Sequence, residues 1–463
     1  MNPLFDKQVY VNRRNVLAQK VGSGLILFLG NNESPMNYPA NCYKFRQDSN
    51  FIYYFGLTLP NMAAIIDIDN QRTILFGDDY EIDDIIWVGE QPAVNDLANR
   101  VGVSETMSMV KLPQFISNHT QRKLHFTFPY RFDNQIFLSN LLNKKVEELK
   151  SLVSIELTKA IISQRSIKED IEIEEMQKAC VMAYNMHTAV MKACREGISE
   201  QSLVGLAEGS SLTEGNGVSF PIILTQHGEI FHNSDHNVDL KAGKLLLMDA
   251  GVEGQMHYCS DFTRTYPVTG KFTQQQRDIY ELVYQGNMLG ISLVKKDTPY
   301  RDIHFAVAEQ MSEGLKSLGL MKGDIKEAVR LGAHALFFPH GLGHMIGLDV
   351  HDMEGLGENY VGYDETCSRS SIFGTANLRM ARALKPGMVI TVEPGIYFIP
   401  QLIKMWKEQK HLADFINYDQ LDAYLDFGGI RVEDCVAVTD GGNRVLGRHI
   451  PKSVEELENY IGK

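Results

Sequence analysis

The stretch from Phe338 to Asp352 combines residue types that bind metal ions with glycines that permit unusual backbone conformations. It contains three histidines, His340, His344 and His351, among three glycines. Because each glycine lowers helix stability and opens conformations closed to other residues, the pattern predicts a loop rather than a helical i, i+4 pair of histidines. Imidazole is a common metal ligand, so we interpret the stretch as one wall of a metal site. A glycine-rich turn with hydrogen-bonded histidines is the alternative.

Two aspartates lie on neighbouring predicted strands. Asp249 ends an apolar strand that begins near residue 244, and Asp261 lies in the next strand, residues 257–266. A hairpin through residues 251–254 would bring the two carboxylates together. At close range they repel, and one of them would take up a proton unless a cation lies between them. In the alternative interpretation, Asp249 is a turn residue and Asp261 is capped or solvated.

Two glutamates belong to later apolar strands. Glu393 follows the apolar run at residues 388–392 and precedes a Pro-Gly turn. In residues 429–434, strand alternation places Arg431 and Glu433 on the same face. A glutamate in an apolar strand is costly unless it is paired or bound to a metal. An ion pair between Arg431 and Glu433 is therefore the structural alternative to a metal ligand.

Together these residues form an oxygen-rich set of candidate ligands with a single imidazole: Asp249, Asp261, His344, Glu393 and Glu433. Four carboxylates carry four negative charges, which two divalent cations would neutralise. The set favours a two-metal centre with a bridging water or hydroxide. Its oxygen ligands favour Mn²⁺ or a similar ion over a thiolate-type zinc site, with Co²⁺ and Zn²⁺ as alternatives.

The candidate ligands all lie in the second half of a long chain, after a predicted first domain. At 463 residues, the chain is too long for one ordinary core and predicts two domains. Apolar runs between turn residues predict an α/β domain in residues 1–160, with a helix at residues 134–149. Its predicted strands are residues 25–29, 51–55, 63–68, 73–76 and 85–88.

The second predicted domain, residues 161–463, begins with a long amphipathic helix. Residues 166–169, Ser-Ile-Lys-Glu, have the spacing of a capping box, which predicts a helix start near residue 168. A second cap at residues 273–276 predicts another helix, and residues 300–318 predict a third. Because these helices alternate with strands, the domain is predicted to be α/β or α+β.

Composition restricts the location and partners of the chain. Its 44% hydrophobic and 22% charged residues are typical of a soluble globular protein, and no block of like charge concentrates the net charge of -13. There is no basic face for nucleic acid, no signal-peptide core and no early apolar run of membrane-spanning length. The six cysteines lack the paired spacing of a disulfide framework or a zinc knuckle. We therefore expect a cytoplasmic protein that binds neither nucleic acid nor membranes.

Five ordered motifs resemble those of the pita-bread metallopeptidases (family M24): residues 247–251 (LMDAG), 260–264 (SDFTR), 340–344 (HGLGH), 392–397 (VEPGIY) and 429–434 (GIRVED). Within that family the chain resembles the proline-specific branch, Xaa-Pro dipeptidase (prolidase) and Xaa-Pro aminopeptidase (aminopeptidase P). Residues 43–56 resemble the N-terminal domain of those enzymes. The resemblance implies an α/β N-terminal domain of creatinase/aminopeptidase P type and an α+β pita-bread catalytic domain.

The resemblance also implies roles for individual side chains. It assigns the metal ions to the five candidate ligands, with the two aspartates and Glu433 bridging or bidentate. His232, His340 and His351 would line the substrate site, stabilise the tetrahedral intermediate and assist proton transfer to the proline nitrogen. That nitrogen is a poor leaving group until it is protonated. Glu393 would take the proton from the attacking water while also binding metal.

Residues beyond the metal ligands bear on substrate choice. The resemblance places Tyr397 and Arg431 beside the metals, in a supporting or a purely structural role. Arg379 matches the arginine with which prolidases hold the free carboxylate of a dipeptide, a task that suits a guanidinium. The insertion at residues 400–427 is also prolidase-like, whereas residues 45–51 look more like aminopeptidase P. The sequence therefore favours prolidase over aminopeptidase P activity on dipeptides or short peptides.

The same fold allows other functions. A metal-free amidinohydrolase of the creatinase kind and a peptide-binding protein without catalysis are the alternatives, and both should lack several metal ligands. All five are present here, which favours a working peptidase. The family further implies a homo-oligomer, a dimer or tetramer, with the N-terminal domain at the contacts.

Overall fold

The computed structural model describes residues 4–463, which form two compact units. The first unit ends at Arg165 and the second begins at Ser166. The predicted boundary, between residues 160 and 161, lies inside helix α8 (Ile155–Arg165). This helix packs on α1 (Lys7–Val21) and therefore belongs to the first unit.

A five-stranded mixed sheet forms the centre of the first unit, in the order β4-β3-β2-β1-β5. Its strands are β1 (Leu25–Leu29), β2 (Ala63–Asp67), β3 (Arg72–Phe76), β4 (Glu105–Met107) and β5 (Leu124–His125). The three longest strands pair antiparallel, and β4 and β5 join them in parallel. Leu27, Ile65 and Ile74 lie opposite one another across these three strands and share one core. The strands predicted at residues 25–29, 63–68 and 73–76 are therefore confirmed.

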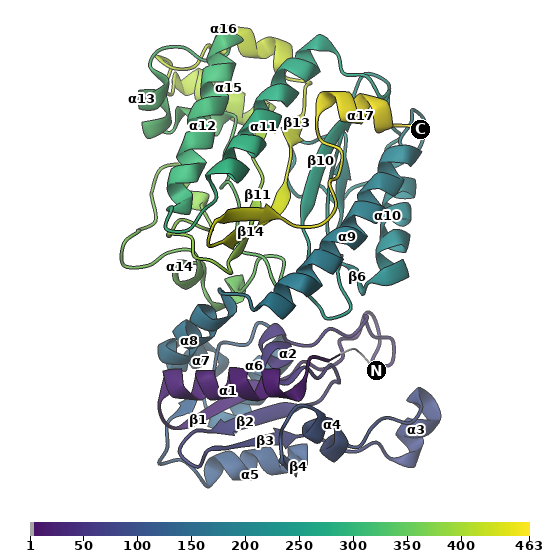
Figure 1. The fold of residues 1–463 in the computed structure, drawn as a ribbon, viewed down its shortest axis with the longest axis vertical. Helices are drawn as coiled ribbons and strands as arrows, with labels where there is room; N and C mark the ends of the chain where they lie inside the picture. Colours follow the sequence, from purple (N-terminus) through teal and green to yellow (C-terminus); the bar gives the residue numbers. More distant parts are fainter. Residues whose placement is uncertain (1–3) are drawn as a thin grey trace. The chain divides into compact units, whose positions relative to one another are not determined.

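The helices of the first unit, coloured purple to blue in Figure 1, include α2 (Ser49–Phe55), α3 (Ile82–Val88), α4 (Val94–Arg100), η1 (Met109–Lys111), α5 (Leu112–Ser117), α6 (Phe132–Leu142) and α7 (Val146–Leu152), besides α1 and α8. The single helix predicted at residues 134–149 was wrong, because Asn143 adopts a left-handed conformation (φ 50°) that ends α6.

Two segments predicted as strands, residues 51–55 and 85–88, are helical. Asp48 caps α2 by accepting a hydrogen bond from the backbone of Phe51 (3.0 Å), and every residue of this helix is buried. An aromatic run that is buried on all sides carries no helical periodicity, so the pattern was misleading there. Helix α3 instead exposes most of its apolar side chains, with Trp87 86% exposed.

The second unit is built on short antiparallel sheets. Its strands are β6 (Gly217–Val218), β7 (Ile223–Thr225), β8 (Leu245–Ala250), β9 (Val252–Glu253), β10 (Phe262–Pro267), β11 (Val389–Val392), β12 (Gly395–Tyr397), β13 (Gly429–Arg431), β14 (Asp434–Thr439) and β15 (Gly442–Val445). They form two three-stranded sheets, β10-β8-β7 and β11-β14-β15, and two pairs, β12-β13 and β6-β9. Every pairing is antiparallel, so the unit is α+β.

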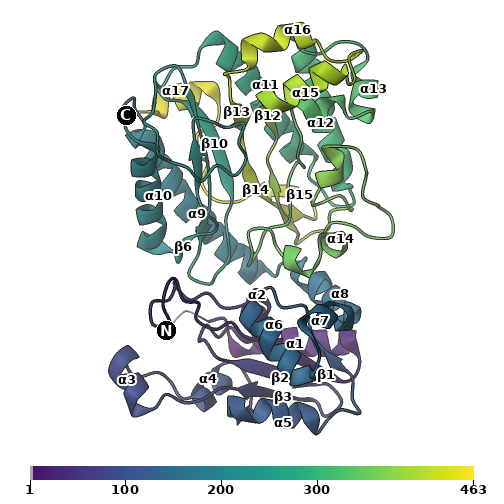
Figure 2. The ribbon, with the colours of Figure 1, turned by 180° about the vertical axis from the view of Figure 1, so that it is seen from behind.

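Helices flank these sheets. They are α9 (Asp170–Ala193), α10 (Glu200–Glu214), α11 (Gln274–Leu293), α12 (Tyr300–Ser317), α13 (Ile325–Arg330), η2 (Ala333–Leu336), η3 (Glu354–Leu356), α14 (Glu358–Val361), η4 (Thr375–Asn377), α15 (Pro400–Gln409), α16 (Tyr418–Leu421), η5 (Asp422–Tyr424) and α17 (Val454–Tyr460). Helix α9 packs against α10, and α11 against α12. In both views β10 and β13 lie between these two helix pairs (Figures 1 and 2).

The predicted helix starts agree with the structure except at the first. Helix α9 begins at Asp170 and is capped by Glu169 with Glu172, not by a box formed by Ser166 and Glu169. The cap at residues 273–276 and the helix at residues 300–318 are confirmed by α11 and α12. Within residues 4–463, no helix combines the length and apolar character needed to cross a bilayer.

Candidate metal centre

The two aspartates come together through the pairing of β8 with β10. Asp249 lies near the end of β8, opposite Thr263 of β10, and Asp261 directly precedes β10. The predicted hairpin is confirmed by the antiparallel pairing of β8 with β10, but the connection is longer than residues 251–254 and contains β9, which pairs with β6. The aspartates nevertheless interact: burial, and next the charge of Asp249, raise the pKa of Asp261.

The two glutamates lie at junctions between sheets. Glu393 falls between β11 and β12, and Glu433 between β13 and β14. Since β11 pairs with β14 and β12 with β13, the two junctions face each other. Asn287 of α11 spans them, because its Nδ2 donates to the carbonyl oxygens of Val392 (2.9 Å) and Val432 (3.3 Å). The residues that precede both glutamates are thus held by one carboxamide.

The loop predicted at residues 338–352 is confirmed, and it runs beside β11. The backbone of Thr391 donates to the carbonyl oxygen of His344 (2.9 Å). Gly343 is needed for this approach, because an added Cβ would lie only 2.2 Å from the Thr391 carbonyl oxygen. His344 Nδ1 contacts the carbonyl oxygen of Met345 (3.0 Å), which makes Nδ1 the protonated nitrogen and leaves Nε2 free as a ligand.

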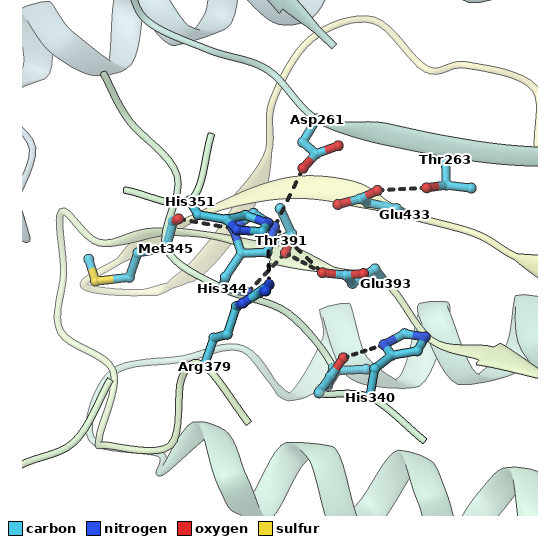
Figure 3. A network of polar contacts seen from close by, with 12 residues as sticks. Asp261, Thr263, His340, His344, Met345, His351, Arg379, Thr391, Glu393 and Glu433 are labelled. Carbon is cyan, nitrogen blue, oxygen red and sulfur yellow. Dashed lines mark hydrogen bonds and ion pairs between the residues drawn. The ribbon is translucent and has the colours of Figure 1, made fainter. Parts of the chain in front are cut away.

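Figure 3 shows four of these side chains converging, namely Asp261, His344, Glu393 and Glu433. His344 Nε2 lies 3.4 Å from Asp261 Oδ2 and 3.6 Å from Glu393 Oε1. One ligand atom each from Asp261, His344 and Glu433 lie within 4.8 Å of one another. Within residues 4–463, the buried Oδ1 atoms of Asp249 and Asp261 have no hydrogen-bond partner.

The raised pKa values of the clustered carboxylates indicate a site that a positive charge would stabilise. Burial, followed by neighbouring carboxylates, raises the pKa of Glu433 well above its ordinary value. Burial also raises the pKa of Glu393 to about 7, although His344 and Arg431 oppose the shift. Ionised carboxylates this close would repel each other in a dry site. Oxygen-rich ligands, crowded charge and unpartnered acceptor atoms fit divalent cations.

Arg431 has a different partner from the one that the sequence allowed. Its Nη2 pairs with Asp249 Oδ2 (2.6 Å), its Nε donates to Thr263 Oγ1 (3.1 Å) and its Nη1 donates to the Tyr397 hydroxyl (2.8 Å). Glu433 is not its partner and instead accepts from Thr263 Oγ1 (2.7 Å). Sequence reasoning missed Thr263, although it lies two residues after Asp261 and on the same side of a strand by alternation.

The remaining predicted residues except Tyr397 line one cavity of about 580 Å³, together with the five candidate ligands. His340 Nε2 contacts the Tyr397 hydroxyl (2.8 Å) and its Nδ1 the carbonyl oxygen of Gly341 (2.8 Å). Burial lowers the pKa of His340 to about 3, so the ring is neutral. His351 stacks edge-on against His344, with centroids 4.2 Å apart.

His232 and Arg379 also line this cavity, and His232 is exposed. Phe231 is a wall residue that sequence reasoning missed; its ring meets those of Tyr397 (4.6 Å) and His340 (5.5 Å). Its position directly before His232 was the available signal. The structure therefore brings all eleven predicted residues to one site, either in the cavity wall or, for Tyr397, in direct contact with it.

Comparison with known proteins agrees with this chemistry. The chain matches the model of metallopeptidase family M24 over residues 174–440 and that of the aminopeptidase P N-terminal domain over residues 10–126. A probable Xaa-Pro aminopeptidase of Metarhizium acridum is 31% identical over 425 residues, which cover 90% of this chain and 81% of that protein. The Xaa-Pro dipeptidase of Homo sapiens is 29% identical over 449 residues, covering 95% and 89%.

Solved structures extend the likeness to the whole chain. Aminopeptidase P from E. coli with the inhibitor Pro-Leu has a TM-score of 0.81 and 26% identity, covering 99% of this chain and 98% of that one. The fold and the site thus define a metallopeptidase of the pita-bread type. The chain belongs to metallopeptidase family M24. The predicted fold class, an α/β N-terminal domain before an α+β pita-bread domain, is confirmed.

Proposed function

We propose that this protein hydrolyses the bond between an N-terminal residue and a following proline. Relatives named Xaa-Pro aminopeptidase and Xaa-Pro dipeptidase support the substrate class. The observation that carries the proposal is the convergence of four carboxylates and one free imidazole nitrogen in a single cavity. A cavity of about 580 Å³ is also large enough for a short peptide.

In this proposal two divalent ions are held by Asp249, Asp261, His344, Glu393 and Glu433. When bound, such ions would neutralise the four carboxylates, polarise the scissile carbonyl group and activate a water molecule for attack. Mn²⁺ is the ion we expect, with Co²⁺ and Zn²⁺ as alternatives. A structure of zinc-substituted E. coli aminopeptidase P supports Zn²⁺ as one of these alternatives.

The side chains of the cavity supply proton transfer and orientation. Glu393 lines the cavity beside His344, where its carboxylate suits a group that takes a proton from the attacking water and returns it. His340 receives a hydrogen bond from Tyr397, whose hydroxyl in turn accepts from Arg431, so the three side chains act as one oriented unit. We propose that His232, His340 and His351 contact the substrate and assist proton delivery to the proline nitrogen.

A direct assay tests the function. Purified protein loaded with Mn²⁺ should release the N-terminal residue from Xaa-Pro and from Xaa-Pro-Yaa-Zaa, and should leave peptides with alanine in place of proline intact. Failure on both proline substrates would overturn the peptidase proposal. Creatine is the matched test of the amidinohydrolase alternative, and tight binding of peptides without cleavage would favour a binding protein.

Replacement of Arg379 by alanine tests the preference for dipeptides that the sequence favours. Arg379 lines the cavity, where its guanidinium could hold the carboxylate of a proline that ends the peptide. We expect R379A to lower kcat/KM for Xaa-Pro by about tenfold or more, mainly through KM, and to change that for Xaa-Pro-Yaa-Zaa much less. An equal loss for both substrates would remove this role from Arg379.

We also propose that the chain forms a homo-oligomer, a dimer or tetramer, through its first unit. Helix α3 supports this, since Ile82, Ile86 and Trp87 are 69%, 71% and 86% exposed. Apolar surface of this kind is typical of protein interfaces. A monomeric mass by light scattering over a range of concentrations would contradict the proposal. The net charge of -13 argues against nucleic acid as a partner.

A further inference from the structure

Arg379 does not stand alone in the cavity wall. It belongs to a chain of alternating charges, which we call the rim cluster: Arg369, Glu358, Arg379 and Glu354. Arg369 Nη2 lies 2.7 Å from Glu358 Oε2, and Arg379 Nε lies 3.8 Å from Glu358 Oε1. Arg379 Nε also lies 3.6 Å from Glu354 Oε2. All four side chains are about one-third exposed, so the rim cluster is open to solvent.

The local fold holds this cluster together. Glu354 and Glu358 are the first residues of two consecutive short helices, η3 and α14. Met353, which directly precedes η3, has a left-handed backbone conformation (φ 63°). Arg369 is anchored from behind, because it donates to the carbonyl oxygen of Ala376 (2.9 Å) and lies over the Tyr363 ring (4.7 Å). The inner end of the cluster is Glu354, which pairs with His351 Nδ1 (2.6 Å).

The charges of the rim cluster cancel. Two guanidinium groups face two carboxylates, and His351 adds no charge when its Nδ1 donates to Glu354 and its Nε2 accepts from Arg379 Nη1 (3.5 Å). The positive charge of Arg379 is therefore already balanced by the neighbouring carboxylates of Glu354 and Glu358 when a peptide carboxylate binds to it. Of these five residues, only Arg379 and His351 line the cavity. Glu354, Glu358 and Arg369 therefore act on the substrate through their charge and not by direct contact.

We propose that Glu354, Glu358 and Arg369 set how strongly the cavity attracts a carboxylate on the proline, and thereby the balance between Xaa-Pro dipeptides and longer peptides. The inference rests on the proposed function and specifies its substrate class. Because the cluster is neutral, the preference for peptides that end at proline should depend on direct contact with Arg379 and not on a net positive field at the rim. Removing one glutamate charge should shift the balance toward dipeptides, and removing the Arg369 charge should shift it away.

The sharpest test compares Xaa-Pro with its amide, Xaa-Pro-NH₂, which has the same length and lacks the carboxylate. The variant of choice is E358Q, because glutamine keeps a hydrogen-bond acceptor for Arg369, whereas Glu354 also orients His351. Removal of one unit charge that is separated from the bound carboxylate by the guanidinium of Arg379 should raise the ratio of kcat/KM for acid over amide by about threefold, through KM rather than kcat. Added salt should reduce the effect.

Charge changes of opposite sign provide the controls. R369Q should lower the same ratio by less than E358Q raises it, because Arg369 lies beyond Glu358, and R369K, which keeps the charge, should leave the ratio unchanged. E327Q removes an exposed carboxylate that pairs with Arg330 (2.6 Å) outside the cavity and should have no effect. A ratio that E358Q does not move, or that R369K moves as much as R369Q, would overturn the inference. If the parent protein cleaves Xaa-Pro-Yaa-Zaa but neither Xaa-Pro nor its amide, the proposed function stands and this inference fails; if it cleaves none of the three, the proposed function itself fails.

Discussion

Glutamine in place of Glu433 should abolish hydrolysis while making the metal-free protein more stable. Glu433 is 2% exposed and its pKa is raised by burial and by Asp261. Without an ion, its charge is therefore unfavourable, and glutamine keeps an acceptor for the hydroxyl of Thr263. We expect E433Q to lower kcat/KM by about a thousandfold and to raise the free energy of unfolding of the metal-free protein by about 1–2 kcal/mol.

Denaturant unfolding after chelation, together with metal content by mass spectrometry, checks this prediction. The neighbouring Asp434 is the matched control, because its side chain is also buried but its negative charge is balanced by two basic side chains. Burial alone would raise the pKa of Asp434, yet Arg264 (2.7 Å) and Lys452 (2.7 Å) hold it below its ordinary value. D434N should therefore destabilise the metal-free protein. If E433Q retained two ions and full activity, Glu433 would have no place in the ligand set.

Removal of the ions should make the stability of the protein fall as the pH rises. In the folded, metal-free state Glu393 has a pKa of about 7, against an ordinary value of 4.5, and the pKa values of Asp261 and Glu433 are also raised. Between these two values folded Glu393 binds a proton that the unfolded state has released, so its contribution to stability is complete below about pH 4.5 and lost above about pH 7, and the raised pKa values of Asp261 and Glu433 act in the same direction. Glu393 alone would account for about 3 kcal/mol.

Thermal unfolding from about pH 5 to about pH 8, with and without chelator, measures the effect. The loaded protein should lack this decline, because bound cations keep the carboxylates ionised, and its affinity for metal should increase with pH. E393Q should flatten the curve of the metal-free protein by removing one titrating group. A difference in stability between the loaded and the chelated protein that did not widen as the pH rises would contradict the assignment of these carboxylates to a crowded cluster that requires cations.

The sequence was informative where a pattern has one physical cause. The strand that carries Asp249 was predictable, because a short apolar run that ends at an aspartate and a glycine is typical of a buried strand. The loop around His344 was predictable from its glycines, and Gly343 does make close contact with Thr391. The helices at residues 51–55 and 85–88 were not, because one is buried on all sides and the other exposes its apolar residues.

Partners across the fold were also beyond the sequence. Arg431 and Glu433 are two residues apart and looked like an ion pair, yet Arg431 turns to Asp249 and Tyr397. That choice depends on how β8 and β12 meet β13, which local spacing does not contain. Glu354 is a different case, since its position three residues after His351 was a usable signal for the contact between the two side chains (2.6 Å).

Asn287 links the two junctions that carry Glu393 and Glu433. Its amide nitrogen contacts the residues before both glutamates, and its Oδ1 accepts from Lys452 (2.8 Å), which also holds Asp434. Helix α11 therefore holds the two junctions that carry Glu393 and Glu433 at a fixed separation, through contacts that involve no ion. The cost of crowding these carboxylates is met by the folding free energy, so the centre is preorganised, and less of the binding energy of the ions is spent on drawing the ligands together.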